Sequence, residues 1–263
     1  MKPVLQTERL TKYFGGLKAV CNFDFNLEEG ELVGLIGPNG AGKTTVFNLI
    51  TGMYEPTEGK ISFMNEELFR LKPHQITQKG IARTFQNIRL FNDLTVLDNV
   101  RIAYQYHLSY GLFGSIFRTH KFRKEEKQIE EIALELLGLF NLEGRRNEVA
   151  RNLPYGEQRR LEIARALASK PKLLLLDEPA AGMNPTEVSQ LMELIKFIRE
   201  KFQITILLIE HQMKVVMGIC ERVVVIDFGE VIAEGSPQEV QNDAKVIEAY
   251  LGEPLRDCGS GSV

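Results

Sequence analysis

Residues 37–45 read GPNGAGKTT, and this stretch decides the fold class. It has the spacing of a phosphate-binding loop, GxxxxGK followed by Ser or Thr, and it follows ELVGLIG (31–37), which is typical of a short buried strand. Glycines let backbone N–H groups turn toward phosphates, and the N-terminus of the expected following helix adds partial positive charge. The sequence therefore predicts a bound nucleoside triphosphate. The residues expected to surround it are Gly37, Pro38, Asn39, Gly40, Ala41, Gly42, Lys43, Thr44 and Thr45.

Two side chains of this loop have specific expected roles. Lys43 should reach the β- and γ-phosphates, and the hydroxyl of Thr44 should bind Mg²⁺. The alternative is a glycine-rich turn that only resembles the motif. The lysine, the hydroxyls of Thr44 and Thr45 and the strand–loop–helix context make that alternative the weaker interpretation.

A second motif, LLLLDEP (173–179), is an apolar strand that ends in two carboxylates. Asp177, at the strand end, is expected to hold Mg²⁺, as phosphate-binding-loop enzymes require. Glu178, one residue further on, is expected to polarise an attacking water. The alternative for Glu178 is an ordinary carboxylate at a helix start, and the phosphate-binding loop upstream favours the catalytic role.

Composition argues against several other classes of protein. The formal net charge of −3 at pH 7 argues against a general nucleic-acid binder. Cys21, Cys220 and Cys258 are widely spaced, which favours a reducing compartment and gives no sign of a metal site. No apolar run approaches the roughly 20 residues that a bilayer-spanning helix needs. We therefore expect a soluble chain whose membrane role, if any, depends on partner proteins.

The secondary-structure signals change along the chain. Residues 19–37 alternate like β-structure, whereas from about Thr95 the apolar periodicity is helical. KLLLLDE (172–178) and ITILLIE (204–210) are apolar runs of the kind that are buried in parallel sheets. The second half thus alternates strand and helix.

A third stretch, LPYGEQRRLEIARALA (153–168), lies between the two motifs. The three stretches, in this order, resemble the ATP-binding subunits of ABC transporters. The resemblance runs from about Leu5 to Gly252, nearly the whole chain. It implies an ATPase that binds ATP and Mg²⁺, with Glu178 as the base.

Further residues match motifs of that family. Gln86 in RTFQ matches the Q-loop glutamine, which contacts Mg²⁺ and faces the membrane subunit. His211 in IEHQM matches the switch histidine that senses the γ-phosphate, and Phe14 in KYFGG matches the aromatic on which adenine stacks, with Tyr13 as the alternative. The resemblance thus implies catalytic roles for Lys43, Glu178 and His211, and metal contacts by Thr44, Gln86 and Asp177.

The resemblance also implies an active site made by two subunits. Two ATPase subunits close face to face, and the signature loop of each contacts the ATP held by the other. An isolated monomer should hydrolyse ATP poorly, because donors must surround the charge that spreads over the γ-phosphate oxygens. The residues that this chain would contribute in trans are Leu153, Pro154, Tyr155, Gly156 and Glu157.

Pro154 and Asn184 depart from the family pattern. The usual signature is LSGGQ, and Pro154 removes both a hydroxyl and its own backbone N–H, leaving the Gly156 N–H and the following helix start to approach a phosphate. Either this site is weak and the partner's signature loop supports most turnover, or the hydroxyl was never dominant in this subgroup. We favour the second because the other catalytic elements are intact. Asn184 stands where many relatives carry the D-loop aspartate, and with Pro185 and Glu187 it also forms a capping-box pattern.

Longer stretches such as RTFQNIRLFNDLTVLDNV (83–100) and VIEAYLGE (246–253) are similar to one subgroup, the ATPases of bacterial branched-chain amino acid importers. This implies a second ATPase subunit in a homodimer or heterodimer, two transmembrane permease subunits and, indirectly, an extracytoplasmic substrate-binding protein. The chain would act at the cytoplasmic face of the membrane. The alternatives are an exporter subunit and a soluble ABC ATPase acting on nucleic acid or ribosomes. The single set of motifs disfavours the latter, so no nucleic-acid partner is expected.

The expected fold class is α/β, with a mostly parallel sheet in a phosphate-binding-loop core, an N-terminal antiparallel β-subdomain and an inserted α-helical subdomain. One ABC ATPase domain would span residues 1–252. Its core would comprise 1–89 and 169–252, and its helical subdomain, with the signature, 90–168. Residues 253–263 would form a loose tail.

Overall fold

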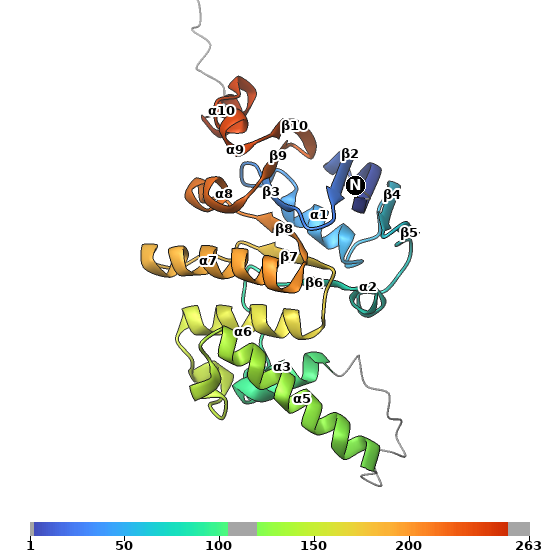
Figure 1. Ribbon diagram of the computed structural model, residues 1–263. Helices are drawn as coiled ribbons and strands as arrows, with labels where there is room; N and C mark the ends of the chain where they lie inside the picture. Colours follow the sequence, from blue (N-terminus) through green and yellow to red (C-terminus); the bar gives the residue numbers. More distant parts are fainter. Residues whose placement is uncertain (1–2, 105–119, 252–263) are drawn as a thin grey trace, which may run out of the picture.

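The computed structural model describes residues 3–104 and 120–251 (Figure 1). The predicted loose tail at 253–263 lies outside the described residues. Within the described ranges, none of the helices combines the length and the apolar character that crossing a membrane requires.

A six-stranded sheet forms the centre of the molecule (Figure 1). Five of its strands are parallel, and β10 pairs antiparallel with β9 at one edge. Every residue of β3, β7 and β8 is buried, as expected for strands that are covered on both faces. This confirms the predicted, mostly parallel sheet. In sheet order the strands are β10 (Glu230–Gly235), β9 (Arg222–Asp227), β3 (Leu32–Ile36), β8 (Thr205–Ile209), β7 (Leu173–Asp177) and β6 (Ile81–Arg83).

A four-stranded antiparallel sheet confirms the expected N-terminal β-structure. Its strand order is β2-β1-β4-β5. The first two strands form a hairpin in which Tyr13 pairs with Lys18 and Phe14 with Leu17, and Gly15, with φ 58°, lies in the turn. The strands are β1 (Pro3–Phe14), β2 (Leu17–Glu28), β4 (Glu58–Phe63) and β5 (Glu66–Glu67).

Two hydrophobic cores lie on opposite faces of the central sheet. Val33 and Leu35 of β3 pack with α1 and the antiparallel sheet, whereas Leu32 and Ile36 pack with residues of α6, α7 and α8. This division follows from the strand geometry, since successive side chains point to opposite faces. The helices are α1 (Lys43–Ile50), α2 (Pro73–Lys79), α3 (Val96–Tyr104), α5 (His120–Leu139), α6 (Tyr155–Ala168), α7 (Pro185–Phe202), α8 (Met213–Ile219), α9 (Pro237–Gln241) and α10 (Ala244–Leu251).

The helices α3, α5 and α6 are packed together at the bottom of Figure 1, next to α7 and the edge strand β6. They come from the chain between β6 and β7, which confirms the predicted helical insertion. The boundaries 90–168 stay a prediction. The predicted capping box is confirmed at α7, where the Asn184 side chain accepts from the N–H groups of Thr186 and Glu187, and the Glu187 carboxylate accepts from the Asn184 N–H.

Candidate active site

Residues 37–42 connect the end of β3 to α1, which begins at Lys43, so the stretch 37–45 has the strand–loop–helix context that the sequence predicts. Two of its glycines are required by their surroundings. Gly37 has φ 152°, and a Cβ there would lie 2.0 Å from the Ile226 carbonyl oxygen. Gly42 has φ 105°, and a Cβ there would lie 2.3 Å from the Ala19 carbonyl oxygen. Only glycine allows this backbone path, and among the described residues no side chain caps the start of α1. The first N–H groups of α1 therefore remain for an anion.

The Lys43 side chain lies at the centre of this loop. The residue is 7% exposed, and its Nζ donates to the carbonyl oxygens of Gly37 at 2.6 Å and of Pro38 at 2.8 Å. Burial lowers the pKa of Lys43, and the nearby carboxylates of Glu178 and Asp177 oppose that decrease. The ammonium group is thus close to both acidic residues and is held by the loop that should receive the phosphates.

Asp177 ends β7 and forms a buried ion pair that the sequence did not indicate. Its Oδ2 accepts from Arg83 Nη2 at 2.7 Å, and the two side chains are 3% and 5% exposed. Arg83 ends β6, the neighbouring parallel strand, and also donates to Asn48 Oδ1 of α1 at 2.7 Å. Arg83 therefore ties the orientation of the Asp177 carboxylate to the helix that follows the loop. The only sequence signal was a charged residue directly after the apolar part of a short strand.

The residues expected to hold Mg²⁺ fit that ion chemically. Thr44 is exposed at the start of α1, and it offers a hydroxyl, while Asp177 offers a carboxylate and Gln86 an amide. Hard oxygen donors of this kind suit Mg²⁺, which usually takes one or two carboxylates together with substrate phosphates. Within the described residues, no group of three or more His, Cys, Asp or Glu side chains is placed so that it could hold a metal ion.

Three expected site residues meet just after the end of β7: Glu178, Gln86 and His211. Gln86 Nε2 donates to Glu178 Oε2 at 2.9 Å, and His211 Nδ1 lies 3.6 Å from the same oxygen. The Glu178 side chain is 18% exposed and that of His211 is 52% exposed, so both remain accessible from solvent. The arrangement holds the Glu178 carboxylate where solvent reaches it, so that it can accept a proton from water.

Glu178 also has an unusual backbone conformation. Its φ is 46°, a left-handed value that costs an ordinary residue about 1–2 kcal/mol. Its N–H donates to the Ile209 carbonyl oxygen at the end of β8, at 2.9 Å, which fixes this turn. Strained backbone of this kind concentrates at functional sites, and here it sets the direction of the Glu178 side chain.

Glu210, which directly precedes His211, is a second residue that sequence reasoning missed. It is fully buried and accepts from the backbone N–H groups of Ala180 at 2.9 Å, His211 at 3.2 Å and Gln212 at 3.4 Å. Burial raises the pKa of its carboxyl, and these N–H groups oppose that increase. Glu210 thereby joins the His211 loop to the segment after Glu178. The signal was its place at the end of the apolar run ITILLIE.

The two aromatic residues proposed for adenine stacking both lie at the end of β1. Phe14 is 41% exposed and Tyr13 is 37% exposed, so exposure does not distinguish them. The Phe14 ring makes an edge contact with Tyr54, with centroids 5.1 Å apart, and Lys12 Nζ lies 5.3 Å from its centroid. Tyr54 is an additional aromatic neighbour. The stacking role of Phe14 stays a prediction.

The signature residues lie at the start of α6, in the helical part of the molecule. Pro154 is the N-cap, with φ −54° and ψ 151°, and its carbonyl oxygen accepts from the N–H groups of Glu157 and Gln158, each at 2.9 Å. The N–H groups of Tyr155 and Gly156 are the ones without an intrahelical acceptor, because they begin the helix. The proline thus leaves a normal helix start, and the in trans roles of these residues stay a prediction.

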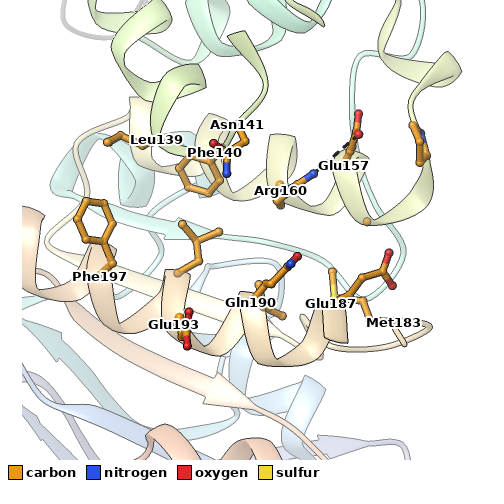
Figure 2. Close-up of a pocket in the computed structure, with 14 residues that line it drawn as sticks. Leu139, Phe140, Asn141, Glu157, Arg160, Met183, Glu187, Gln190, Glu193 and Phe197 are labelled. Atoms are coloured by element: carbon orange, nitrogen blue, oxygen red, sulfur yellow. Dashed lines mark ion pairs between the residues drawn. The ribbon is translucent and has the colours of Figure 1, made fainter. Parts of the chain in front are cut away.

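A groove of about 520 Å³ separates this helix start from α7. Figure 2 shows Phe140, Glu157 and Arg160 on one wall, and Glu187 and Phe197 on the α7 wall. The groove narrows at Gly156, where a Cβ would lie 3.0 Å from Glu187 Oε1. The start of α6 therefore lies close to Glu187 of α7 at this end of the groove.

Comparisons with known proteins find relatives that match nearly the whole chain. The family described as "ABC transporter" matches residues 20–181, and the family described as "Branched-chain amino acid ATP-binding cassette transporter" matches residues 230–255. The high-affinity branched-chain amino acid transport ATP-binding protein BraF of Pseudomonas aeruginosa is 46% identical, over 96% of this chain and 99% of that protein. LivG of Escherichia coli K12, which carries the same description, is 47% identical over the same shares.

Solved structures also match over most of the chain. The ADP conformation of MJ1267, an ATP-binding cassette of an ABC transporter, has a TM-score of 0.82 and 32% identity, and the match covers 96% of this chain and 100% of that one. A dimeric post-hydrolysis structure of the cassette MJ0796 with ADP and Pi has a TM-score of 0.75 and 29% identity, covering 89% and 98%.

Proposed function

The chain belongs to the ABC transporter family of ATP-binding, ATP-hydrolysing subunits, and we propose that it drives an importer of branched-chain amino acids. The ATPase activity is carried by one observation: Glu178 lies between Gln86 and His211 at the end of β7, close to Lys43. The solute is supported by relatives named for branched-chain amino acid transport, at 46–47% identity over nearly the whole chain. The C-terminal family match at 230–255 supports the same solute.

Each residue of the site would have a distinct task. The N–H groups of 37–45 and the Lys43 ammonium would bind the phosphates of ATP, as in other phosphate-binding loops. Thr44, Asp177 and Gln86 would hold Mg²⁺, which when bound supplies positive charge against the charge that develops on the phosphate oxygens. Glu178 would accept a proton from the attacking water. His211 would keep the Glu178 carboxylate in place and contact the γ-phosphate.

We further propose that the chain works as half of an ATPase pair. A solved cassette of this family is dimeric. No described side chain caps the start of α6, so its first N–H groups could bind a phosphate of the ATP on a second subunit. Residues 153–157 would therefore contact the ATP of a second ATPase subunit. The pair would sit on two permease subunits at the cytoplasmic face of the membrane and receive solute through a separate binding protein.

The transport proposal is tested by assembling this chain with its candidate second ATPase, permease and binding-protein subunits in lipid vesicles. We expect ATP-dependent uptake of labelled leucine, isoleucine and valine, and no uptake of labelled glutamate or glucose. A vesicle lacking only this chain is the control. Turnover coupled to a different solute would reject the branched-chain assignment and keep the ATPase, whereas turnover stimulated by RNA rather than by the permeases would reject the transporter role.

Pro154→Ser tests whether the missing signature hydroxyl limits turnover. We expect kcat of the assembled ATPase pair to change by less than about threefold, against the roughly 100-fold expected for a central donor. The reason is that the helix start is already formed, with the N–H groups of Tyr155 and Gly156 available. Steady-state phosphate release at saturating ATP measures it. A gain of 100-fold or so would instead mark this signature as degenerate.

A further inference from the structure

A fully buried ion pair on α6 holds the backbone around Gln86. Arg159 and Glu162 have 0% and 1% exposed side chains, and Arg159 Nη1 lies 2.9 Å from Glu162 Oε2. Arg159 also donates to the carbonyl oxygens of Phe85 at 2.5 Å and Gln86 at 2.7 Å. Glu162 Oε1 accepts from the N–H groups of Phe85 at 3.3 Å and Arg89 at 3.0 Å. We call this arrangement the Arg159–Glu162 clasp. Arg159 binds carbonyl oxygens of the loop that carries Gln86, and Glu162 binds N–H groups of the same loop.

Stability alone does not account for the clasp. Replacing a buried ion pair by apolar side chains of similar volume is often neutral or stabilising, because desolvation offsets the Coulombic gain. Arg159 Nε, moreover, is buried and has no hydrogen-bond partner among the described residues, which adds a further cost. A charged pair at such a cost is better explained by a role in orienting other groups. The clasp holds the backbone on both sides of Gln86 and so fixes where the Gln86 side chain starts.

At its outer end the clasp contacts the signature loop. Arg159 Nη2 donates to the Tyr155 hydroxyl at 3.2 Å. Tyr155 stands at the third signature position, where the family pattern has glycine, and it is 45% exposed. Its ring also lies against the D-loop, the stretch AAGMNP (180–185), since a Cβ at Gly182 would be 3.2 Å from Tyr155 Cε1. One side chain thus contacts the D-loop and the clasp, and it retains a surface that faces outward.

At its inner end the clasp leads to the proposed base. The carbonyl of Gln86 accepts from Arg159, and the Gln86 side chain donates to Glu178 Oε2 at 2.9 Å. The connected groups are therefore Tyr155, Arg159, Gln86 and Glu178. Each neighbour in this series is joined by a hydrogen bond of 3.2 Å or less.

We propose that Arg159 is a positioning residue that couples the signature loop to this chain's own hydrolysis site. Contact of Tyr155 with the ATP of the partner subunit shifts Arg159, which moves the Gln86 backbone and with it the hydrogen bond to Glu178. The ATP held by the partner subunit thereby sets the alignment of Glu178 in this chain's own site. This inference rests on the proposed function, because it needs the signature loop to face a second ATP.

The kinetic test is a double-mutant cycle in the assembled ATPase pair. Arg159→Lys keeps the charge opposite Glu162 but loses the planar fork that reaches both Gln86 and Tyr155, and Tyr155→Phe removes only the hydroxyl. We expect Arg159→Lys to lower kcat about tenfold with KM for ATP changed less than about twofold, because the phosphate-binding loop is untouched. Tyr155→Phe should lower kcat about threefold in the parent and not at all in Arg159→Lys. If the double variant instead loses kcat by the product of the two single-variant losses, the two residues act independently and the proposal is overturned.

Arg160→Lys provides the matched control. Arg160 is the next residue on the same helix, but it faces the groove of Figure 2, where its partner is Glu157 at 3.9 Å. The same substitution there should leave kcat and KM within about twofold of the parent, since it breaks no contact to the Q-loop. A loss as large as that of Arg159→Lys would point to general damage to α6 and would count against the proposal.

Amide hydrogen exchange tests the same link without ATP. Arg159→Lys should speed exchange of the Phe85 and Arg89 amides about fivefold or more, and Tyr155→Phe should speed it about twofold in the parent and not in Arg159→Lys. Unchanged exchange in both variants would overturn the coupling even if the chain is an active ATPase. Coupled exchange in a chain that shows no turnover with any partner would support the link and reject the proposed function.

Discussion

Glu178→Gln is expected to lower ATP turnover by about 100- to 10,000-fold, the usual contribution of a positioned general base. The amide cannot accept the proton of the attacking water. It keeps an oxygen to accept from Gln86 Nε2, and it meets the same left-handed backbone position as the glutamate, so the site geometry should persist. Single-turnover phosphate release measures the loss.

The same variant should bind ATP at least as tightly as the parent. Removing the Glu178 charge takes a negative group away from the place where phosphate oxygens would bind, next to Lys43. In the proposed pair, ATP binding would close the two subunits and hydrolysis would open them. Equilibrium titration with ATP and light scattering should therefore show a nucleotide-bound pair that persists in this variant. Glu193→Gln, the same change at an exposed position of α7, is the control and should behave like the parent. Turnover within tenfold of the parent would show that another group removes the proton.

The phosphate-binding loop and the strand before it were predictable because their signal is local. Nine consecutive residues specify the turn, and the conformations of Gly37 and Gly42 explain why glycine stands at those positions. The capping box at Asn184 was predictable for the same reason, since its partners lie within three residues. The fully apolar runs of β7 and β8 likewise indicated strands covered on both faces.

The contacts that orient the site could not be predicted, because they join residues far apart in the sequence. Arg83 and Asp177 are 94 residues apart and meet only because β6 and β7 are neighbouring strands. Arg159 reaches Gln86 across 73 residues through the packing of α6 beside the Q-loop. The sequence supplied the residue types that do chemistry, whereas the sheet order and helix packing supply their orientation.

Lys43→Met is expected to weaken ATP binding about 100-fold, equivalent to about 2.8 kcal/mol and within the range of strong hydrogen bonds to charged groups. Methionine fills a similar volume but brings no charge to the phosphates. It also leaves the carbonyl oxygens of Gly37 and Pro38 without the donor that now holds the loop in shape. Titration with a fluorescent ATP analogue in the presence of Mg²⁺ measures the dissociation constant.

The pH dependence of binding separates the charge of Lys43 from its shape. Burial lowers the pKa of Lys43 below its ordinary value of 10.5, so the ammonium loses its proton at a lower pH than an exposed lysine does. Binding by the parent should therefore weaken as the pH rises toward that lowered pKa, while the residual binding of Lys43→Met should stay level over the same range. Lys60→Met, at an exposed position of β4, controls for the loss of one positive charge and should keep the affinity and pH profile of the parent. Parent-like affinity in Lys43→Met would mean that the backbone N–H groups and the helix start bind the phosphates without the lysine.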